Sequence, residues 1–393
     1  MEQSYIRIIF WIALFLLFYS YVGYGLLLYT VVRLKKWMQS NKARKTLLFK
    51  PLPEVTLIIP AYNERSCIAQ KLRNSLQLNY PPHKLQLMFV TEGSTDGTTE
   101  FLSEYSQIQV IAGTVRKGKI EAINQAMKLV TTPIVVFTDA NTLLNRDAIL
   151  TLVQHYNDPN VGAVSGEKRI ATTQLAEAAG AGEGLYWKYE SLLKKLDAEL
   201  NTIVGAAGEL FSIRTGLYEP VEKDTLLDDF IISMRIAEKG YKVVYEPEAY
   251  AIETPSFSIA EEMKRKVRIC TGGFQSIVRL KHLLNPFKYG LLSFQYLSHR
   301  VFRWTVAPLC IPLLFITNLL LAPSSKLFEA VFILQCLFYL LAIIGYMLEK
   351  NKLRIQALFV PFYFSFMHYT VFLGFVKYIT TTQTGIWEKV KRT

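Results

Sequence analysis

Residues that form disulfides or bind soft metal ions are scarce in this chain. Its 393 residues include four cysteines and five histidines. The cysteines match neither a disulfide framework nor a CxxC pair, so we interpret them as packing residues in a reduced compartment. The histidines lack the spacing of metal ligands, and we assign none of them a role as a catalytic base. These residues are Cys67, Cys270, Cys310, Cys336, His83, His155, His282, His299 and His368.

Charged residues are nearly missing from four hydrophobic stretches. Residues 5–32 contain one charge, Arg7, and at about 1.5 Å per residue they can cross the roughly 30 Å hydrocarbon core of a bilayer. We predict a transmembrane helix there and expect it to be retained, because it lacks the basic start and small-residue cleavage site of a secretory signal. Residues 301–321, 327–348 and 355–376 are similar, so we assign about three further membrane segments to residues 301–377.

The distribution of basic residues predicts the orientation of these segments. Six lysines and arginines follow the first stretch, at positions 33, 35, 36, 42, 44 and 45, whereas Glu2 and Arg7 lie at its other end. Basic loops stay in the cytoplasm, so we expect a multi-pass protein of the cell membrane with a cytoplasmic domain. The basic loop 349–354 agrees with this. The last stretch contains Pro361 and either spans or lies at the interface; we expect the basic tail, residues 378–393, in the cytoplasm.

The net charge of +12 raises the question of nucleic acid. Much of the basic excess, however, flanks hydrophobic segments, as in residues 264–268 and 279–303. Anionic lipid headgroups and a phosphorylated substrate explain it better, so we expect a lipid bilayer and no nucleic acid among the partners. For residues 264–268, a basic helix lying on lipid is the alternative to a role in the site.

Between the hydrophobic ends lies a polar insert, residues 51–285, followed by a predicted interfacial amphipathic helix at residues 286–300. The first half of the insert alternates short β-branched runs with helical patterns, which indicates an α/β fold with a mostly parallel sheet. Ligands of such sheets bind at the carboxyl ends of the strands. The expected strands are residues 55–59, 85–90, 108–112 and 134–137, and the expected helices are residues 66–78, 98–105, 119–130 and 146–155.

Polar motifs occur at these strand ends. Residues 60–64, PAYNE, follow the first strand, and residues 91–98, TEGSTDGT, follow the second. Turn formation and helix capping, by Asn63 or Ser66 and by Asp96, explain each of these motifs equally well. After the fourth strand, Asp139 and Asn141 offer oxygen ligands on a short loop. Such ligands suit a hard divalent cation that also holds phosphate oxygens.

A second acidic cluster, Asp228 and Asp229, precedes an amphipathic helical pattern. Together with Asp139 it suggests acid/base and metal chemistry performed beside a membrane. Helix caps and surface carboxylates are the alternative, because a carboxylate stabilises the positive end of a helix dipole.

Seven motifs of the insert resemble, in order and approximate spacing, those of membrane-bound family 2 glycosyltransferases. This group contains cellulose, chitin, hyaluronan and poly-N-acetylglucosamine synthases, and the resemblance extends to membrane segments at both ends. It implies a GT-A type nucleotide-sugar domain, Rossmann-like, with transmembrane helices at both ends. The motifs are VTLIIPAYNE, EGSTDGT, RKGKIEAINQA, FTDAN, GAAGELFSIR, LLDDFIISMRIAEKGYKVVYEPEA and RKVRICTGGFQ.

The resemblance implies a donor site with a bound Mg²⁺ or Mn²⁺. The acidic position that binds the nucleotide falls on Glu92. The metal motif falls on Asp139, with Asn141 where many relatives have a second Asp, so the metal site has a single carboxylate. The other residues implied in the donor pocket are Pro60, Tyr62, Glu64 and Lys119.

On the acceptor side, the resemblance places the acceptor loop at residues 205–214, where Glu209 is a candidate for hydroxyl contacts. The catalytic base falls on Asp229, with Asp228 where Glu is usual. A base is needed because a sugar hydroxyl must lose its proton while it attacks the anomeric carbon. We expect Asp228 to cap the helix or to hold Asp229.

A downstream arginine motif departs from the family pattern. Many processive synthases have Gln-x-x-Arg-Trp, whereas this chain has Arg265-Lys266-Val267-Arg268-Ile269. Arg268 is expected to stabilise a diphosphate, with charge-assisted bonds from Arg265. Loss of the Trp removes a stacking platform, so processive synthesis is an open question. Trp387 lies in a tail that resembles a segment of hyaluronan synthase-like enzymes reaching back to the site; an interfacial Trp is the equal alternative.

We therefore predict an inverting glycosyltransferase of polysaccharide biosynthesis. It transfers a sugar from a nucleotide-diphospho-sugar to a glycan or lipid-linked acceptor, and a UDP-sugar is the expected donor. One alternative is transfer of a single sugar to a polyprenyl phosphate whose lipid enters beside residues 287–296. The other is a non-catalytic membrane partner subunit that retains the fold. The motifs specify no export or assembly partner.

Overall fold

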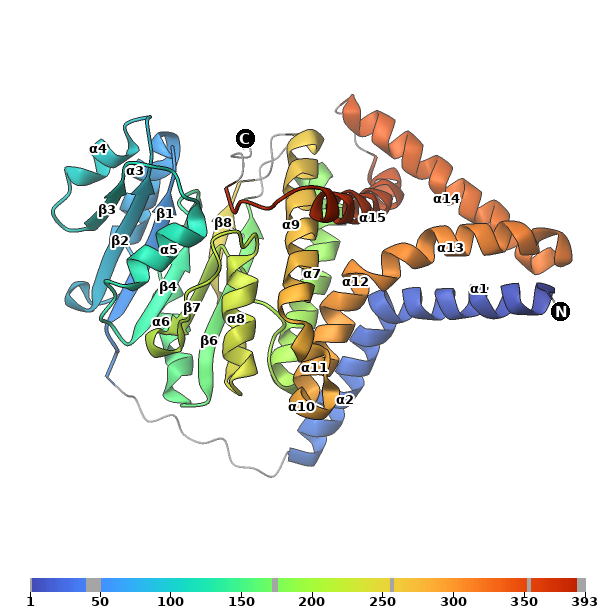
Figure 1. Ribbon diagram of the computed structural model, residues 1–393, viewed down its shortest axis with the longest axis horizontal. Coiled ribbons are helices and arrows are strands. Elements are labelled where there is room, and N and C mark those ends of the chain that lie inside the picture. Colours follow the sequence, from blue (N-terminus) through green and yellow to red (C-terminus); the bar gives the residue numbers. More distant parts are fainter. Residues whose placement is uncertain (1, 40–50, 172–175, 255–257, 352–354, 387–393) are drawn as a thin grey trace. The chain divides into compact units, whose positions relative to one another are not determined.

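The computed structural model describes residues 2–39, 51–171, 176–254, 258–351 and 355–386 (Figure 1). The chain divides into two compact units. The sheet unit comprises residues 36–171, 197–257 and 382–393, and the helical unit comprises residues 1–35, 172–196 and 258–381.

One mixed sheet forms the centre of the sheet unit, with the strand order β3-β2-β1-β4-β7-β6-β8-β5. Strands β1 to β4 are mutually parallel where they pair, as are β6 and β8, whereas β7 runs antiparallel to both its neighbours and β5 antiparallel to β8. The strands are β1 (Val55–Ala61), β2 (Leu85–Glu92), β3 (Gln109–Gly113), β4 (Ile134–Thr138), β5 (Thr142–Leu144), β6 (Val161–Ile170), β7 (Leu210–Arg214) and β8 (Lys242–Glu253).

The strand order reverses between β1 and β4, because the chain runs from β1 outward to β2 and β3 and then returns to the other side of β1. The carboxyl ends of strands beside such a reversal form a crevice that binds ligands in α/β proteins. The motif of residues 60–64 and Asp139 follow β1 and β4 respectively. The topology therefore positions both predicted motifs at this crevice.

Helices cover both faces of the sheet, and β1 and β4 consist almost entirely of buried residues as a result. Helices α3, α4 and α6 contribute Ile68, Leu102 and Leu152 to the cluster on one face. On the other face α5 packs on β1 and β2, and α8 packs on β6 and β8 (Figure 1). The helices are α3 (Arg65–Leu76), α4 (Thr98–Ser103), α5 (Lys119–Met127), α6 (Ala148–Gln154) and α8 (Asp228–Glu238).

The predicted α/β architecture is confirmed, and the four predicted strand and helix pairs are present with ends shifted by a few residues. The second half of the sheet was not anticipated. It adds the two antiparallel strands, β5 and β7, to a sheet that is otherwise parallel, in agreement with the predicted mostly parallel sheet. Strand β7 lies within the GAAGELFSIR motif. The motif was interpreted for its functional residues, so the short hydrophobic run in it was not assigned to a strand.

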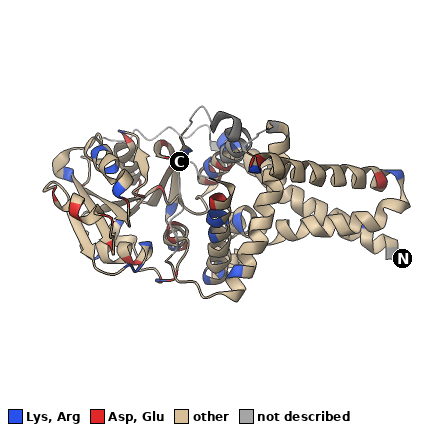
Figure 2. Ribbon diagram, turned by 90° about the horizontal axis from the view of Figure 1, so that it is seen from above, with Lys and Arg blue, Asp and Glu red and all other residues tan. Residues whose placement is uncertain are grey.

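The helical unit contains the long apolar helices. Among the described residues, four helices are long and apolar enough to cross a membrane: Gln3–Met38, Val306–Ser324, Lys326–Lys350 and Ala357–Thr380. Charged residues are sparse along most of their length (Figure 2). The elements are α1 (Glu2–Phe18), α2 (Tyr24–Gln39), α7 (Ala176–Leu200), α9 (Ile259–Arg279), α10 (Pro286–Tyr289), α11 (Leu291–Tyr296), α12 (Phe302–Trp304), α13 (Val306–Leu321), α14 (Lys326–Lys350) and α15 (Gln356–Thr380).

A small residue and a buried ion cluster hold the helical unit together. A Cβ on Gly374 of α15 would lie 2.5 Å from Cβ of Cys270, so glycine permits α15 to pack closely on α9. Glu190 of α7 pairs with Arg300 at 2.8 Å and with Arg303 at 3.0 Å, and His299 lies beside it. The buried charges are therefore paired, as burial in a low-dielectric interior requires.

The predicted domain limits cut across these units. Residues 172–196 and 258–285 of the predicted catalytic domain belong to the helical unit. The predicted interfacial segment, residues 286–300, contains α10, α11 and most of a π-helical turn, Leu297–Val301. Its position in a bilayer stays a prediction, as does the orientation of the four long helices.

Candidate active site

Hydrogen bonds join the loops that follow β1 and β2. The backbone N–H of Asn63, whose φ is 52°, donates to Oγ of Ser94 at 3.2 Å. Oδ2 of Asp96 accepts a bond from the N–H of Arg65, the first residue of α3, at 3.0 Å. Oδ1 of Asp96 accepts from the N–H of Thr98 at 3.1 Å, so Asp96 takes part in the turn before α4. The first N–H of α3 is therefore bonded from the neighbouring loop, and its N-cap position is Glu64 and not Asn63 or Ser66. These hydrogen bonds connect the two strand ends.

Glu92 lies buried at the end of β2, where its Oε2 accepts a bond from the N–H of Lys117 at 3.1 Å. Burial raises the pKa of Glu92, and Lys117 partly opposes that shift. The Arg116 guanidinium lies 3.9 Å from the centre of the Tyr62 ring. Because Pro60 is in register with the last part of β2, the structure brings Pro60, Tyr62 and Glu92 to adjacent strand ends.

Two other residues of this edge make contacts that the sequence interpretation did not include. The carboxylate of Glu64 accepts a bond from Sγ of Cys67 at 3.2 Å, so it lies against the first turn of α3. Arg116 was not singled out, although it lies in the RKGKIEAINQA motif. Its contact with Tyr62 joins distant parts of the chain, and spacing along the sequence carries no signal for it.

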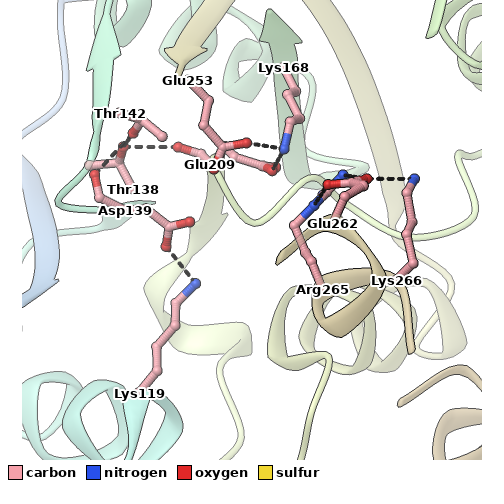
Figure 3. Close-up of polar contacts among 10 residues, drawn as sticks. All are labelled: Lys119, Thr138, Asp139, Thr142, Lys168, Glu209, Glu253, Glu262, Arg265 and Lys266. Carbon is pink, nitrogen blue, oxygen red and sulfur yellow. Dashed lines mark hydrogen bonds and ion pairs between the residues drawn. The ribbon is translucent and has the colours of Figure 1, made fainter. Parts of the chain in front are cut away.

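Lys119, the first residue of α5, connects the two acidic clusters. Its Nζ lies 2.7 Å from Oδ1 of Asp139 (Figure 3) and 3.7 Å from Oδ2 of Asp228. Burial alone would lower the pKa of Lys119, but the attraction of these carboxylates outweighs it and raises that pKa. The two clusters, which are distant in sequence, therefore share one cation in the folded protein.

The residues at Asp139 fit a hard divalent cation. The Lys119 ammonium on Oδ1 shows that positive charge is stabilised there, and buried Oδ2 of Asp228 makes no hydrogen bond among the described residues. No group of three or more His, Cys, Asp or Glu side chains in the described part of the chain is arranged to hold a metal alone. A cation held by Asp139 and Asn141 would therefore complete its ligands with diphosphate oxygens and water, as Mg²⁺ commonly does.

A buried lysine lies beneath this loop. Nζ of Lys71, from α3, donates to Oγ1 of Thr138 at 3.0 Å and to the carbonyl of Thr142 at 2.9 Å. Burial lowers the pKa of Lys71 to about 7, although Asp139 acts in the opposite direction. Thr142 also donates through Oγ1 to the carbonyl of Asp139 at 2.9 Å. Lys71 thus binds both ends of the loop that contains Asp139. The sequence did not reveal this role.

The loop before β7 lies against the start of α8. Gly205 has φ of 88°, and a Cβ there would lie 2.2 Å from the ring of Phe230. The N–H of Ala206 donates to Oγ of Ser233 at 3.0 Å. A Cβ on Gly208 would lie 2.9 Å from Oδ2 of Asp229. The predicted acceptor loop therefore contacts the residue that was predicted as the base.

Asp228 and Asp229 form the first turn of α8. Asp228 is buried and Asp229 is half-buried, and neither occupies the N-cap position, which is Leu227 and has no side-chain capping bond. Burial and the charge of Asp228 raise the pKa of Asp229 to about 7, Glu209 adds to the shift, and Lys119 opposes it. A carboxylate with a pKa near the ambient pH is suited to accept a proton from a hydroxyl group.

The close contact of Gly208 with Asp229 predicts a sensitive position. Gly208→Ala should displace the Asp229 carboxylate and lower sugar transfer by about 10²-fold, because displacements near 1 Å have effects of this size. Gly216→Ala is the matched control, since a Cβ at Gly216 meets no atom within 4 Å. Transfer rates of both variants at equal nucleotide affinity check the prediction. Equal rates for the two variants would contradict it.

Glu209 is held by a buried ion triad. Lys168 of β6 forms ion pairs with Oε1 of Glu209, at 2.5 Å, and with Glu253 at the end of β8. Lys168 is 6% exposed and Glu253 is 4% exposed. The backbone carbonyl of Glu209 accepts a bond from Oγ1 of Thr138 at 2.9 Å (Figure 3). Sequence analysis identified Glu209 but not its two partners.

Arg265 and Arg268, predicted to bind diphosphate, belong to α9 of the helical unit. The guanidinium of Arg265 donates two bonds to Glu262, at 2.9 and 2.7 Å, and Nζ of Lys266 lies 3.7 Å from the same carboxylate. The N-terminus of α9 is capped by Ser258, whose Oγ accepts from the N–H of Glu261 at 3.3 Å. Arg265 therefore has a carboxylate partner on its own helix, which the sequence interpretation did not include.

The chain returns to the sheet unit after residue 381. Gly385 is buried, and a Cβ on Gly118 would lie 3.0 Å from the Gly385 carbonyl oxygen and 3.3 Å from Ile386. The segment before Trp387 thus packs beside the residue that precedes Lys119. Trp387 itself lies outside the described residues.

Comparison with known proteins shows which family the chain resembles. A family model described as glycosyltransferase like family 2 matches residues 53–272. Poly-beta-1,6-N-acetyl-D-glucosamine synthase of Staphylococcus aureus (strain COL) is 26% identical over 282 residues, which are 67% of this chain and 66% of that protein. The enzyme of the same name from Staphylococcus epidermidis is 25% identical over 237 residues, 57% of this chain and 56% of that protein. The chain spans about two thirds of the length of its first curated relative.

A solved structure has the same fold. A mannosyltransferase from Pyrobaculum calidifontis, in complex with GDP-Man and Mn²⁺, superposes with a TM-score of 0.68 at 24% identity and covers 95% of this chain and 99% of its own. The sheet unit is a GT-A-like α/β domain, as the motifs indicated. Since the family model covers more than half of the 393 residues, the chain belongs to the glycosyltransferase family 2.

Proposed function

We propose that this protein is a membrane-embedded inverting glycosyltransferase that transfers a sugar from a UDP-sugar to a hydroxyl group of a glycan or glycolipid. The main support is Asp229, a half-buried carboxylate whose pKa is raised to about 7 by burial and by Asp228, beside the Gly208 loop. Lys119 links this acceptor side to Asp139 on the donor side. The four long apolar helices of the described residues support a membrane location, and the basic residues after position 32 support a sheet unit in the cytoplasm.

The proposed chemistry is a single displacement. The acceptor hydroxyl gives its proton to a carboxylate oxygen of Asp229 while its oxygen forms a bond to the anomeric carbon. The bond from that carbon to the diphosphate oxygen breaks on the opposite face, so the anomeric configuration inverts and the nucleotide diphosphate leaves with the electron pair. General-base assistance of this kind contributes typically about 10²- to 10⁴-fold to the rate.

The donor side is proposed to bind the nucleotide diphosphate. Glu92 and the Tyr62 ring would contact the nucleoside, and Lys119 would pair with phosphate oxygens as well as with Asp139. Mg²⁺ or Mn²⁺, held by Asp139 and Asn141, would neutralise charge on the leaving diphosphate. The structural neighbour was solved with Mn²⁺, which is consistent with a divalent cation of this kind. Arg268 is proposed as a further diphosphate contact.

A radiolabelled donor screen tests the proposed function. The curated relatives are named poly-beta-1,6-N-acetyl-D-glucosamine synthases, so UDP-N-acetylglucosamine is the first donor, with UDP-glucose, UDP-galactose and GDP-mannose beside it. We expect purified full-length protein in lipid nanodiscs to transfer label from one UDP-sugar into a β-linked product and to release UDP. The product is identified by mild acid hydrolysis and mass spectrometry.

The same screen separates the alternatives. Label on polyprenyl phosphate, without glycan elongation, would overturn the proposed acceptor class. Donor binding without turnover, for every donor and acceptor offered to a correctly folded protein, would favour a non-catalytic partner subunit.

A further inference from the structure

The ion triad of Lys168, Glu209 and Glu253 has no part in the chemistry proposed above, although it lies within the same unit. The side chains of Lys168 and Glu253 are 5% and 6% exposed, whereas the Glu209 side chain is 18% exposed. Burying three charged side chains is unfavourable unless they are paired in good geometry. A buried lysine that binds one accessible carboxylate therefore suggests that the position of that carboxylate matters.

Backbone groups of Glu209 and of the residue before it contact the two sides of the site. Its carbonyl accepts the 2.9 Å bond from Thr138, which directly precedes Asp139 on the donor side. Gly208, the preceding residue, packs against the carboxylate of Asp229. The charge of Glu209 is also felt at Asp229, where it contributes to the raised pKa. Glu209 therefore sits between the donor loop and the proposed base, with its side chain directed toward Lys168 (Figure 3).

The chemistry of a carboxylate restricts what it can bind. An ionised carboxylate only accepts hydrogen bonds, so it pairs with the O–H groups of a sugar. A phosphate monoester is an anion near neutral pH and also presents mainly acceptor oxygens. It would meet like charge at Glu209 and at Asp229, and Lys168 is shared between two carboxylates. Within the sheet unit, the acceptor side thus favours hydroxyl groups over phosphate.

We propose that Lys168, supported by Glu253, is a positioning residue that holds Glu209 beside Asp229, and that Glu209 selects an uncharged sugar hydroxyl over a phosphate as the acceptor. The inference rests on the proposed function, because it assumes that Asp229 receives the acceptor proton. It adds the residue that selects the acceptor class and assigns a role to two residues outside the recognised motifs.

Competition between two acceptors tests this selection. The full-length protein in nanodiscs is given its UDP-sugar with a neutral alkyl glycoside and an alkyl phosphate of equal chain length. We expect wild-type protein to use the glycoside at least about tenfold better. Glu209→Gln should raise KM for the glycoside about tenfold, the loss expected when a charged hydrogen-bond acceptor becomes neutral, and should reduce the preference over the phosphate. It should also move the acidic limb of the pH profile to lower pH.

Variants at Lys168 test the positioning role. Lys168→Met should reproduce the higher glycoside KM of Glu209→Gln, and Lys168→Arg should restore most of the wild-type value because it keeps the charge. Glu219→Gln is the matched control, since Glu219 forms an exposed ion pair with Lys239 at 2.8 Å in the same unit. If Lys168→Met does not fold, Glu209→Gln still decides the question because it retains the Lys168–Glu253 pair.

Two results would overturn the inference. One is a wild-type preference for the alkyl phosphate. The other is a Glu209→Gln variant whose glycoside KM, acceptor preference and pH profile equal those of Glu219→Gln. If Asp229→Asn is inactive while Glu209→Gln is unchanged, the inference alone fails. If Asp229→Asn is fully active, both the proposed function and the inference fail.

Discussion

Replacing Asp229 by Asn should lower sugar transfer by about 10²- to 10⁴-fold, with little change in the affinity for the nucleotide-sugar. The amide is nearly isosteric with the carboxylate but cannot accept the acceptor proton. Initial rates of UDP release and calorimetric titration with UDP measure the two quantities separately. A variant that keeps the wild-type rate would show that Asp229 is not the base.

Thermal stability distinguishes this role from that of a helix cap. Burial and Asp228 disfavour the charged form of Asp229 and raise its pKa to about 7. Because the folded state binds this proton more tightly than the unfolded chain, ionised Asp229 destabilises the fold above that pH, and the penalty disappears as the pH falls. The neutral Asn should therefore leave the Tm at pH 8 unchanged or raise it. A lower Tm would indicate that Asp229 mainly stabilises the start of α8.

The pH profile of the wild-type protein gives an independent check of the same residue. A base must be deprotonated, so activity should be full above about pH 7 and fall about tenfold per pH unit below it. The quantity to measure is kcat/KM for the acceptor between pH 5 and pH 9, at saturating donor. An acidic limb near pH 4, typical of an exposed aspartate, would contradict the raised pKa.

The first half of the sheet and its strand ends were predictable because they depend on local patterns. Strand β1 and helix α3 alternate within a short stretch, and a parallel sheet brings its carboxyl strand ends to one edge. Placing Glu92 and Asp139 at that edge therefore needs only strand assignment. The resemblance assigned both Asp139 and Lys119 to the donor side, and the structure adds that they form an ion pair.

The buried lysines were not predictable in this way. Lys168 and Glu209 are separated by 41 positions and Lys71 and Thr138 by 67, so no local spacing connects them. A lone lysine in a strand or an amphipathic helix normally lies in solvent. Only the tertiary structure shows that Lys168 pairs with Glu209 and Glu253, and that Lys71 contacts Thr138 and Thr142 at the ends of β4 and β5. The mixed second half of the sheet, which supplies Glu253 through β8, was missing from the sequence interpretation.

The second large effect is expected at Asp139. Asp139→Asn should lower transfer by at least about 10²-fold and weaken nucleotide binding in the presence of Mn²⁺, because it removes the single carboxylate of the proposed metal site. The loss has a second origin. Without the charge of its 2.7 Å partner, Nζ of Lys119 keeps the more distant carboxylate of Asp228, at 3.7 Å, and the connection between the donor and acceptor sides is weakened.

Titration with UDP separates the loss of the metal ligand from the loss of the Lys119 partner. If the cation binds through Asp139, the affinity for UDP should rise when Mn²⁺ is added to wild-type protein, and this increase should vanish in Asp139→Asn. The matched control is Asp147→Asn, an exposed aspartate eight positions later whose side chain bonds to Asn79 at 2.7 Å, and it should behave as wild type. An equal effect of Mn²⁺ on all three proteins would exclude Asp139 as the ligand. Activity lost in that case would be attributed to Lys119, which would then turn away from the donor and toward Asp228.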